Sequence, residues 1–261
     1  MSNYGLILLA EDNILNQTVT TLLLSKLGYS VEIAANGRQA VDAIRARKSY
    51  LVILMDCMMP EMDGFEASRA IREIQKQHEV YTPIIAVTAM AMAGDHERCI
   101  QAGMDDYMTK PINREILSIK INHWSKQETV LRNQSLAEQH PLSSAVTASA
   151  PLDLNALSAF YETTDLREIF SSFVSATPNV LDQLQTAVAA RDAGITIHLA
   201  HELKSSGTTL GAKDLVKLAL YLQHLAGTRN WPEIEQTTQD LYVSYQHIEK
   251  YIRTKLATTK A

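Results

Sequence analysis

Short apolar runs alternate with helical stretches from Gly5 to about Lys126. Five runs predict strands at Leu6–Ala10, Ser30–Ala34, Leu51–Met55, Ile84–Val87 and Asp106–Thr109, and the helices between them are expected to start near Asn13, Gly37, Gly64, Gly94 and Asn113. The run LVILM is apolar without alternation, which is typical of a strand buried on both faces. Five successive strand–helix units predict an α/β fold, in which helices cover both faces of a five-stranded parallel, doubly wound sheet.

Residues 127–151 break this rhythm, because the stretch is polar, ends in Pro, Ser, Ala and Thr, and shows no sustained apolar period. We interpret it as a linker between a first domain at residues 1–126 and a second at residues 152–261.

Apolar positions after the linker recur at spacings of three and four. They form four stretches, around 166–188, 195–206, 213–226 and 234–252, with no strand pattern between them. This predicts an all-α antiparallel four-helix bundle. Pro178 falls inside the first stretch and is expected to kink that helix or to restart it.

The bulk properties exclude several classes of protein. The 261 residues are typical of two domains, and a net charge of −5 with a pI of about 5.9 argues against a nucleic-acid binder. No apolar run approaches the roughly 18–20 residues that span a bilayer, so we expect no direct membrane insertion. The N-terminus lacks the features of a signal peptide, and Cys57 and Cys99 have neither disulfide-framework nor metal-ligand spacing. We expect a reduced, cytoplasmic chain.

Reactive side chains follow four of the predicted strands. They are Glu11, Asp12, Asp56, Thr88 and Lys110. The carboxyl ends of parallel strands meet at one edge of a sheet, so these groups should converge. Three carboxylates in one place need a cation, and an all-oxygen site suits Mg²⁺. One aspartate could then act as nucleophile towards a phosphoryl donor, with Lys110 and Thr88 contacting the phosphoryl oxygens.

The segments AEDNILNQ, MDCMMPEMDGFEASRAIR, IIAVTAM and AGMDDYMTKPI resemble the sequence blocks of response-regulator receiver domains, in the family's order and spacing. The resemblance implies a flavodoxin-like receiver fold, with Asp56 as the phosphoacceptor. It also implies a Mg²⁺ ion held by Asp12 and Asp56 directly, by Glu11 mostly through water, and by the backbone carbonyl of Met58.

The same resemblance assigns the supporting residues. Thr88 would be the switch hydroxyl, Tyr107 the aromatic side chain that reorients with it, and Lys110 the phosphate contact. A cis peptide bond is expected before Pro111. The AEDNxxNQ pattern is most similar to receivers attached to hybrid sensor kinases.

Other interpretations of this half are weaker. The methionines Met55, Met58, Met59 and Met62 could form a soft-metal site, but methionine is far more often a flexible filler of gaps. Cys57 could suggest redox control, although burial behind a strand end is the simpler expectation. Phosphatases of the haloacid-dehalogenase type also use a Mg²⁺-bound aspartate, with a second aspartate two residues later as general acid. Met58 occupies that position here.

In the second half, the segment HLAHELKSSGTTLGA contains a candidate phosphoacceptor, His201. It lies about 200° around the helix from Leu199 of the buried stripe, so we expect it to point to solvent. Lys204, one turn on, offers a positive charge to a bound phosphoryl group. His198 and His201 have a spacing that could suit a metal, but no third ligand is evident and the segment is not the HExxH zinc motif.

The segment resembles the phosphoacceptor helix of histidine-phosphotransfer (HPt) domains. The resemblance implies that His201 carries a phosphoryl group, that Lys204 is the neighbouring lysine, and that Gly211 is the later glycine of the motif. Ser205 stands where many members have glycine.

The two resemblances together imply a phosphorelay. An upstream sensor histidine kinase would phosphorylate Asp56, which would pass the group to His201 and then to a downstream response regulator. Nothing in the chain resembles a kinase ATP site, and its domain order is that of the C-terminal part of a tripartite hybrid sensor kinase, which could place it as the cytoplasmic part of a membrane protein. The alternatives are a Mg²⁺-dependent phosphatase and an interaction module gated by phosphorylation.

Overall fold

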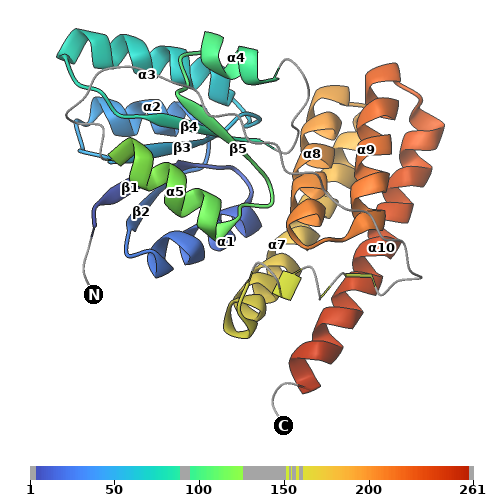
Figure 1. The fold of residues 1–261 in the computed structure, drawn as a ribbon. Helices are drawn as coiled ribbons and strands as arrows, with labels where there is room; N and C mark the ends of the chain where they lie inside the picture. The colour runs from blue at the N-terminus through green and yellow to red at the C-terminus, as the bar shows by residue number, and fades with distance from the viewer. Residues whose placement is uncertain are drawn as a thin grey trace.

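The computed structural model describes residues 4–88, 95–125, 151–152, 154, 157–158 and 161–258. An α/β part and a helical part lie side by side, with helix α1 of the first beside helices α7 and α8 of the second (Figure 1). Most of the predicted linker, residues 127–150, lies outside the described residues, as do the predicted helix start at Gly94 and the last three residues.

The α/β part contains the predicted parallel sheet. Its strands are β1 (Leu6–Ala10), β2 (Ser30–Ala34), β3 (Val52–Asp56), β4 (Ile84–Thr88) and β5 (Asp106–Thr109). The strand order is β2-β1-β3-β4-β5, and every neighbouring pair is parallel. The order reverses beside β1, so the carboxyl ends of β1 and β3 form the switch point where such sheets bind ligands.

Alternate strand residues pack on opposite faces of the sheet. The helices are α1 (Ile14–Lys26), α2 (Gly37–Arg45), α3 (Gly64–His78), α4 (Asp95–Gln101) and α5 (Arg114–Ser125). Side chains of α1 and α5 pack with Ile7, Leu9 and Leu54, whereas those of α2, α3 and α4 pack with Leu8 and Ile53. All five residues of β3 are buried, as its continuous apolar run predicted.

The helical part is the predicted four-helix bundle. Its helices are α7 (Thr163–Ala189), α8 (Ala193–Thr209), α9 (Lys213–Thr228) and α10 (Trp231–Thr258), joined by connections of two or three residues. None of the described helices combines the length and the low polarity that crossing a bilayer requires.

The expectation that Pro178 could restart the first bundle helix is wrong, because α7 continues through this residue. A proline has no N–H to donate to the carbonyl four residues earlier, which here belongs to Val174. The hydroxyl of Tyr245 on α10 donates to that carbonyl at 3.2 Å. A neighbouring helix therefore satisfies the acceptor that Pro178 leaves free.

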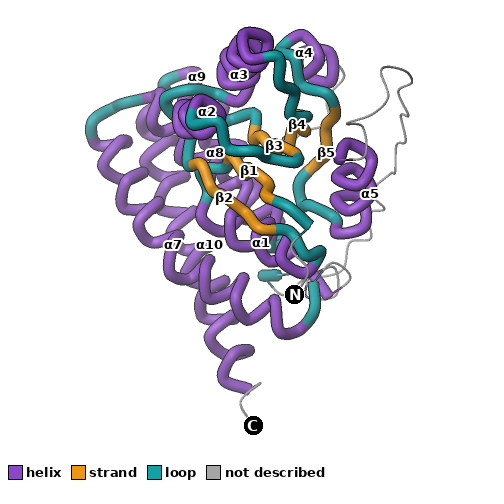
Figure 2. The backbone as a smooth tube through the Cα atoms, turned by 90° about the vertical axis from the view of Figure 1, so that its left-hand side faces the viewer, coloured by secondary structure: helices purple, strands orange, loops and turns teal. Residues whose placement is uncertain are grey.

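The two parts share one apolar cluster. It contains Ile7 and Leu9 of the sheet, Leu15 and Val19 of α1, and Phe173 of α7, all buried. Helix α1 lies beside the sheet in Figure 2, and it contacts both strand β2 and bundle helix α7. Helix α1 is therefore part of both hydrophobic cores.

The Tyr245 hydrogen bond gives a stability prediction for the bundle. Tyr245→Phe leaves the Val174 carbonyl without this donor, so the free energy of unfolding should fall by about 1–2 kcal/mol. In a Pro178→Ala background, the restored N–H can donate to Val174, and Tyr245→Phe should cost clearly less. Urea unfolding of the four chains would measure this coupling, and equal losses in both backgrounds would contradict it.

Candidate functional site

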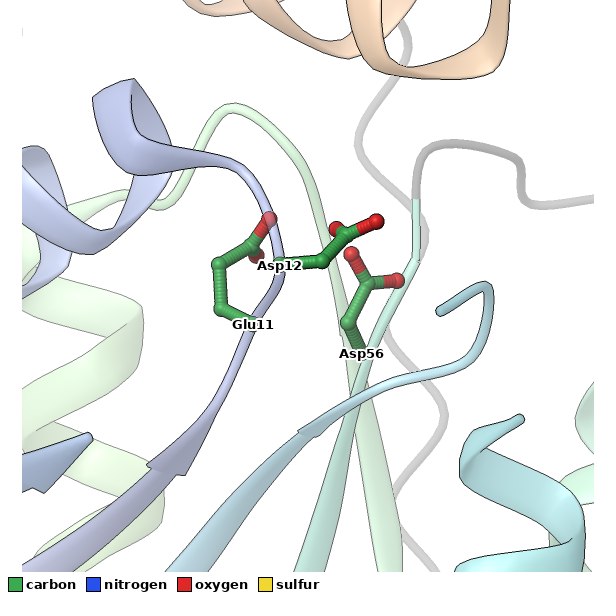
Figure 3. Close-up of side chains that lie close together, drawn as sticks. All are labelled: Glu11, Asp12 and Asp56. Carbon is green, nitrogen blue, oxygen red and sulfur yellow. The ribbon is translucent and has the colours of Figure 1, made fainter. Parts of the chain in front are cut away.

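An acidic cluster lies at the carboxyl ends of β1 and β3. Glu11 and Asp12 follow β1, Asp56 ends β3, and a carboxylate oxygen from each lies within 4.8 Å of the others (Figure 3). The cluster forms because β1 and β3 are hydrogen-bonded neighbours, with Ala10 opposite Met55. It is the only group with metal-holding spacing among the residues that the structure describes.

Lys110 bridges two of the three carboxylates. Its Nζ lies 2.7 Å from Oε2 of Glu11 and 2.6 Å from Oδ2 of Asp56, and the side chain is buried. The Lys110 N–H donates to the carbonyl of Thr88 at 2.7 Å, and the predicted cis peptide bond before Pro111 is confirmed. Lys110 directly follows β5, and its ammonium group lies in the cluster at the end of the sheet.

Burial shifts the pKa values of the ionisable groups in this cluster. It raises the pKa of Glu11 to about 8, although Lys110 acts to lower it. Burial and the nearby Asp56 raise the pKa of Asp12 to about 7. For Lys110, burial acts to lower the pKa, but the carboxylates of Asp56 and Glu11 outweigh it and the pKa is raised. One ammonium does not balance three carboxylates, so the site favours a further cation.

The other predicted receiver residues lie on β4 and β5 and in the loop after β3. Thr88 is the half-buried last residue of β4, and the half-buried Tyr107 of β5 packs against the apolar cluster on the α3 face. The N–H of Met58 donates to Oδ1 of Asp56 at 3.1 Å, while the Met58 side chain is 46% exposed. The structure thus places Met58 against Asp56 and Thr88 next to Val87, the residue opposite Asp56 on β4; the roles of these residues in phosphorylation remain predictions.

Cys57 is buried, as expected, and lies against Cys99 of α4. A hydrogen bond to Cys99, together with burial, raises the pKa of the Cys57 thiol. A raised pKa disfavours the thiolate, which is the reactive form. Cys57, the residue after Asp56, is therefore a poor candidate for redox control.

The expectation that His201 faces solvent is wrong in this arrangement. His201 lies on α8 and is half-buried, while Lys204, Ser205 and Ser206 on the same helix are buried. The polar face of α8 was predicted correctly, but the α/β part of the same chain covers it. The helical period identifies a polar face and carries no information about a partner some 190 residues away in sequence.

Two asparagines at the start of α1 make this contact, although neither was predicted from the sequence to have a role. Asn13 Nδ2 donates to Oγ of Ser206 at 2.8 Å and to the carbonyl of Glu202 at 3.2 Å. Asn16 Nδ2 donates to Oγ of Ser205 at 2.8 Å. A signal existed, because two amides lie in the first turn of a helix that also belongs to the apolar core.

A second group of contacts lies at the other end of α1. Lys26 Nζ lies 2.6 Å from Oδ2 of Asp165 and 3.0 Å from Oε2 of Glu162, near the start of α7. We call these the distal ion pairs. Between the two ends, the hydroxyls of Thr18 and Ser172 lie 3.0 Å apart.

The contact changes the protonation of the histidines on α8. Burial lowers the pKa of His201 to about 4; Asp56 opposes this shift, and Lys204 and Lys110 add to it. The imidazole is therefore neutral at neutral pH, with a lone pair available to attack. His198 does not form a metal pair with His201, because its Nε2 faces Oδ2 of Asp12 at 3.5 Å.

Known families match both parts of the chain. Residues 7–122 match the response regulator receiver domain, and residues 168–254 match the Hpt domain. Hybrid signal transduction histidine kinase I of Dictyostelium discoideum is 48% identical over 120 residues, which are 44% of this chain and 7% of that protein. The signal transduction histidine-protein kinase BarA of Shigella flexneri is 31% identical over 202 residues, 77% of this chain and 22% of that protein.

The chain thus spans less than a quarter of either curated relative. Among solved structures, the receiver domain of a Pseudomonas aeruginosa sensor histidine kinase, with a magnesium ion in its active site cleft, is 46% identical. It covers 48% of this chain and 98% of its own, with a TM-score of 0.43. From the two family matches, we conclude that this chain is a response regulator receiver domain followed by an Hpt domain.

Proposed function

We propose that the chain is a phosphorelay element in which Asp56 receives a phosphoryl group and passes it to His201. One observation carries this proposal: Lys110 Nζ, 2.6 Å from Asp56, also lies 3.4 Å from Oγ of Ser205. Ser205 follows His201 by four residues, about one helical turn. We call the arrangement in which the two domains contact each other the docked arrangement. It brings the proposed donor Asp56 and the proposed acceptor His201 to one buried place.

The residues of the acidic cluster fit a Mg²⁺ ion. Glu11, Asp12 and Asp56 offer only oxygen ligands, and burial, together with the neighbouring carboxylates, raises the pKa of Glu11 and of Asp12. The backbone carbonyl of Met58 would complete the protein ligands. When bound, the ion would neutralise charge on the carboxylates and on the phosphoryl oxygens.

The transfer itself uses side chains of both domains. A lone pair of the neutral His201 imidazole attacks phosphorus, a P–N bond forms, and the P–O bond to Asp56 breaks. Asp56 leaves as a carboxylate that Lys110 and the N–H of Met58 hold. The phosphoimidazolium can then lose its one remaining N–H proton, on the ring nitrogen that did not attack, to solvent. Lys204 and Thr88 supply a positive charge and a hydroxyl for the phosphoryl oxygens.

Two other functions have less support. A phosphatase of the haloacid-dehalogenase type needs a proton donor two residues after the nucleophile, where this chain has Met58. An interaction module needs no reactive histidine, yet the contact surrounds His201 with the groups that a transfer requires. As both curated relatives are named histidine kinases, we place this chain in the cytoplasm, between an upstream sensor histidine kinase and a downstream response regulator.

Labelling would test the two acceptors. With radiolabelled acetyl phosphate and Mg²⁺, the parent chain should carry base-labile label on Asp56 and acid-labile label on His201. Asp56→Asn should lose both, because it keeps the shape of the side chain and removes the nucleophile. His201→Gln should retain only the label on Asp56. Labelling of His201 in the Asp56→Asn chain would contradict the proposed route.

Dilution would test whether the transfer occurs within one chain. Domains joined in one chain meet at an effective concentration of up to about a millimolar, so the rate should not depend on protein concentration. The measurement is the rate at which label moves from Asp56 to His201 over a hundredfold dilution. Rates that fall in proportion to concentration would show transfer between chains.

The raised pKa values predict how Mg²⁺ affects stability at different pH. Without added Mg²⁺, folding favours the protonated forms of Glu11 and Asp12, so their contribution to stability is full below pH 4 and is lost as pH rises through about 7–8. Mg²⁺ needs the ionised forms. The rise in melting temperature on adding Mg²⁺ should therefore be small at pH 5.5 and larger at pH 8.

Asp12→Asn is the matched control, because it removes a proposed direct ligand and one of the shifted groups. This chain should show little response to Mg²⁺ at either pH. A Mg²⁺ response of the same size at pH 5.5 and pH 8 in the parent chain would speak against this prediction.

A further inference from the structure

The docked arrangement occupies both reactive faces of the chain at once. Asp56 is only 3% exposed, and Lys204 and Ser205 beside His201 are buried under the receiver domain. Under the proposed function, Asp56 must also meet an upstream kinase, and His201 must meet a separate regulator. Neither face can serve two partners at the same time.

Part of the interface between the two domains lies far from the groups that take part in phosphoryl transfer. Helix α1 has 13 residues, so Lys26 lies about 20 Å along the helix from Asn13. Its side chain nevertheless contacts Asp165 and Glu162, and the hydrogen bond to Asp165 raises the pKa of Lys26. Lys26 therefore stays charged at neutral pH. The distal ion pairs hold the two domains together without touching a reacting group.

The domain of the same chain and a separate protein compete for the faces around His201 and Asp56, and the domain of the same chain is strongly favoured. A joined domain presents its surface at an effective concentration of up to about a millimolar, far above a partner at micromolar concentration. A separate protein reaches His201 or Asp56 only during the fraction of time in which the two domains are apart. Any contact that stabilises the docked arrangement lowers that fraction.

We propose that the receiver domain is an intramolecular competitor that closes His201 to separate receivers and Asp56 to separate donors, and that the distal ion pairs set the closed fraction. The inference rests on the proposed function, because it concerns access to the same two acceptors. The same contact between the domains promotes phosphoryl transfer from Asp56 to His201 within the chain. It inhibits transfer from a separate donor into the chain and from the chain to a separate receiver.

Two full-length chains test this without any other partner. Chain one carries His201→Gln, and its unused bundle is released from its own receiver by Glu162→Lys and Ser172→Arg. Chain two carries Asp56→Asn. Its unused receiver is released from its own bundle by Lys26→Glu, because the new carboxylate faces the carboxylates of Glu162 and Asp165 at the start of α7. The receiver of chain one and the bundle of chain two both keep the native interface. Asp165 is unchanged because its carboxylate, the buried half of the α7 capping box, accepts the N–H of Glu162 at 3.2 Å; Glu162→Lys removes only the exposed half of that box.

Chain one is labelled on Asp56 with acetyl phosphate, freed of reagent and mixed with chain two at micromolar concentration. Label should reach His201 of chain two at least about tenfold faster than in a reference pair carrying only His201→Gln and Asp56→Asn. Matched controls replace the releasing changes by Lys48→Glu and Glu249→Lys, which break ion pairs with Glu32 and Arg253 elsewhere. The controls should behave like the reference pair, and a released pair no faster than the reference would overturn the proposal.

A cross-link provides the opposite test. The Thr18 and Ser172 hydroxyls lie 3.0 Å apart, so Thr18→Cys with Ser172→Cys should form a disulfide when diamide takes up the two thiol hydrogens. The native Cys57 and Cys99 are buried and should not interfere. The oxidised chain should still move label from Asp56 to its own His201, but should pass none to unlabelled chain one. Reduction should restore that outward transfer, and chains that carry only one of the two introduced cysteines should be insensitive to diamide.

The two proposals fail differently in this test. If oxidised and reduced chains pass label outward equally well, the competition is absent and the relay stands. If label never leaves Asp56 in either form, the proposed relay is wrong.

Discussion

Helix α1 is buried on two sides, and this double burial connects the sheet to the bundle. Its leucines and valine belong to the apolar cluster that begins on the sheet and continues into α7. Its polar residues at both ends and in the middle pair with the bundle. A helix with one buried face would leave the two domains independent. Because α1 directly follows Glu11 and Asp12, the contact also fixes the position of the bundle relative to the acidic cluster.

The buried ammonium of Lys110 connects the two domains through charge, as α1 does through apolar packing. It contacts Glu11 and Asp56 from the receiver and approaches Ser205 from the bundle. Water is largely excluded here, so each charge acts strongly on the others. The same exclusion lowers the pKa of His201 and keeps its imidazole neutral. Burial therefore produces both the carboxylates that favour a cation and the uncharged nitrogen that can attack phosphorus.

The sequence predicted the elements well and their association poorly. The strands were found to within one residue because central parallel strands are continuous apolar runs, and the positions of Asp56 and Lys110 followed from the strand ends. The bundle helices were found from their apolar period. The continuity of α7 through Pro178 was missed, because the donor that replaces the missing proline N–H comes from Tyr245, a residue 67 positions away.

The contact between the domains had no local signal of the kind that periodicity detects. Asn16 and Thr209, which are hydrogen-bonded at 2.8 Å, are 193 residues apart, and each is an ordinary polar residue on its own helix. The exposure expected for His201 was a correct statement about the bundle alone. What covers a polar face becomes visible only when the whole chain is folded.

The hydrogen bonds that the start of α1 makes to the bundle, beside the reacting groups, come from amides and hydroxyls. Asn13, Asn16, Ser205 and Ser206 exchange hydrogen bonds that water can replace at a small net cost. Separating the domains leaves no bare charge on either asparagine or serine. Apolar area and distant charges therefore contribute to how long the domains stay together. Substitutions at the far end of α1 could thus lengthen or shorten each encounter during evolution while the surroundings of the phosphoryl group stay the same.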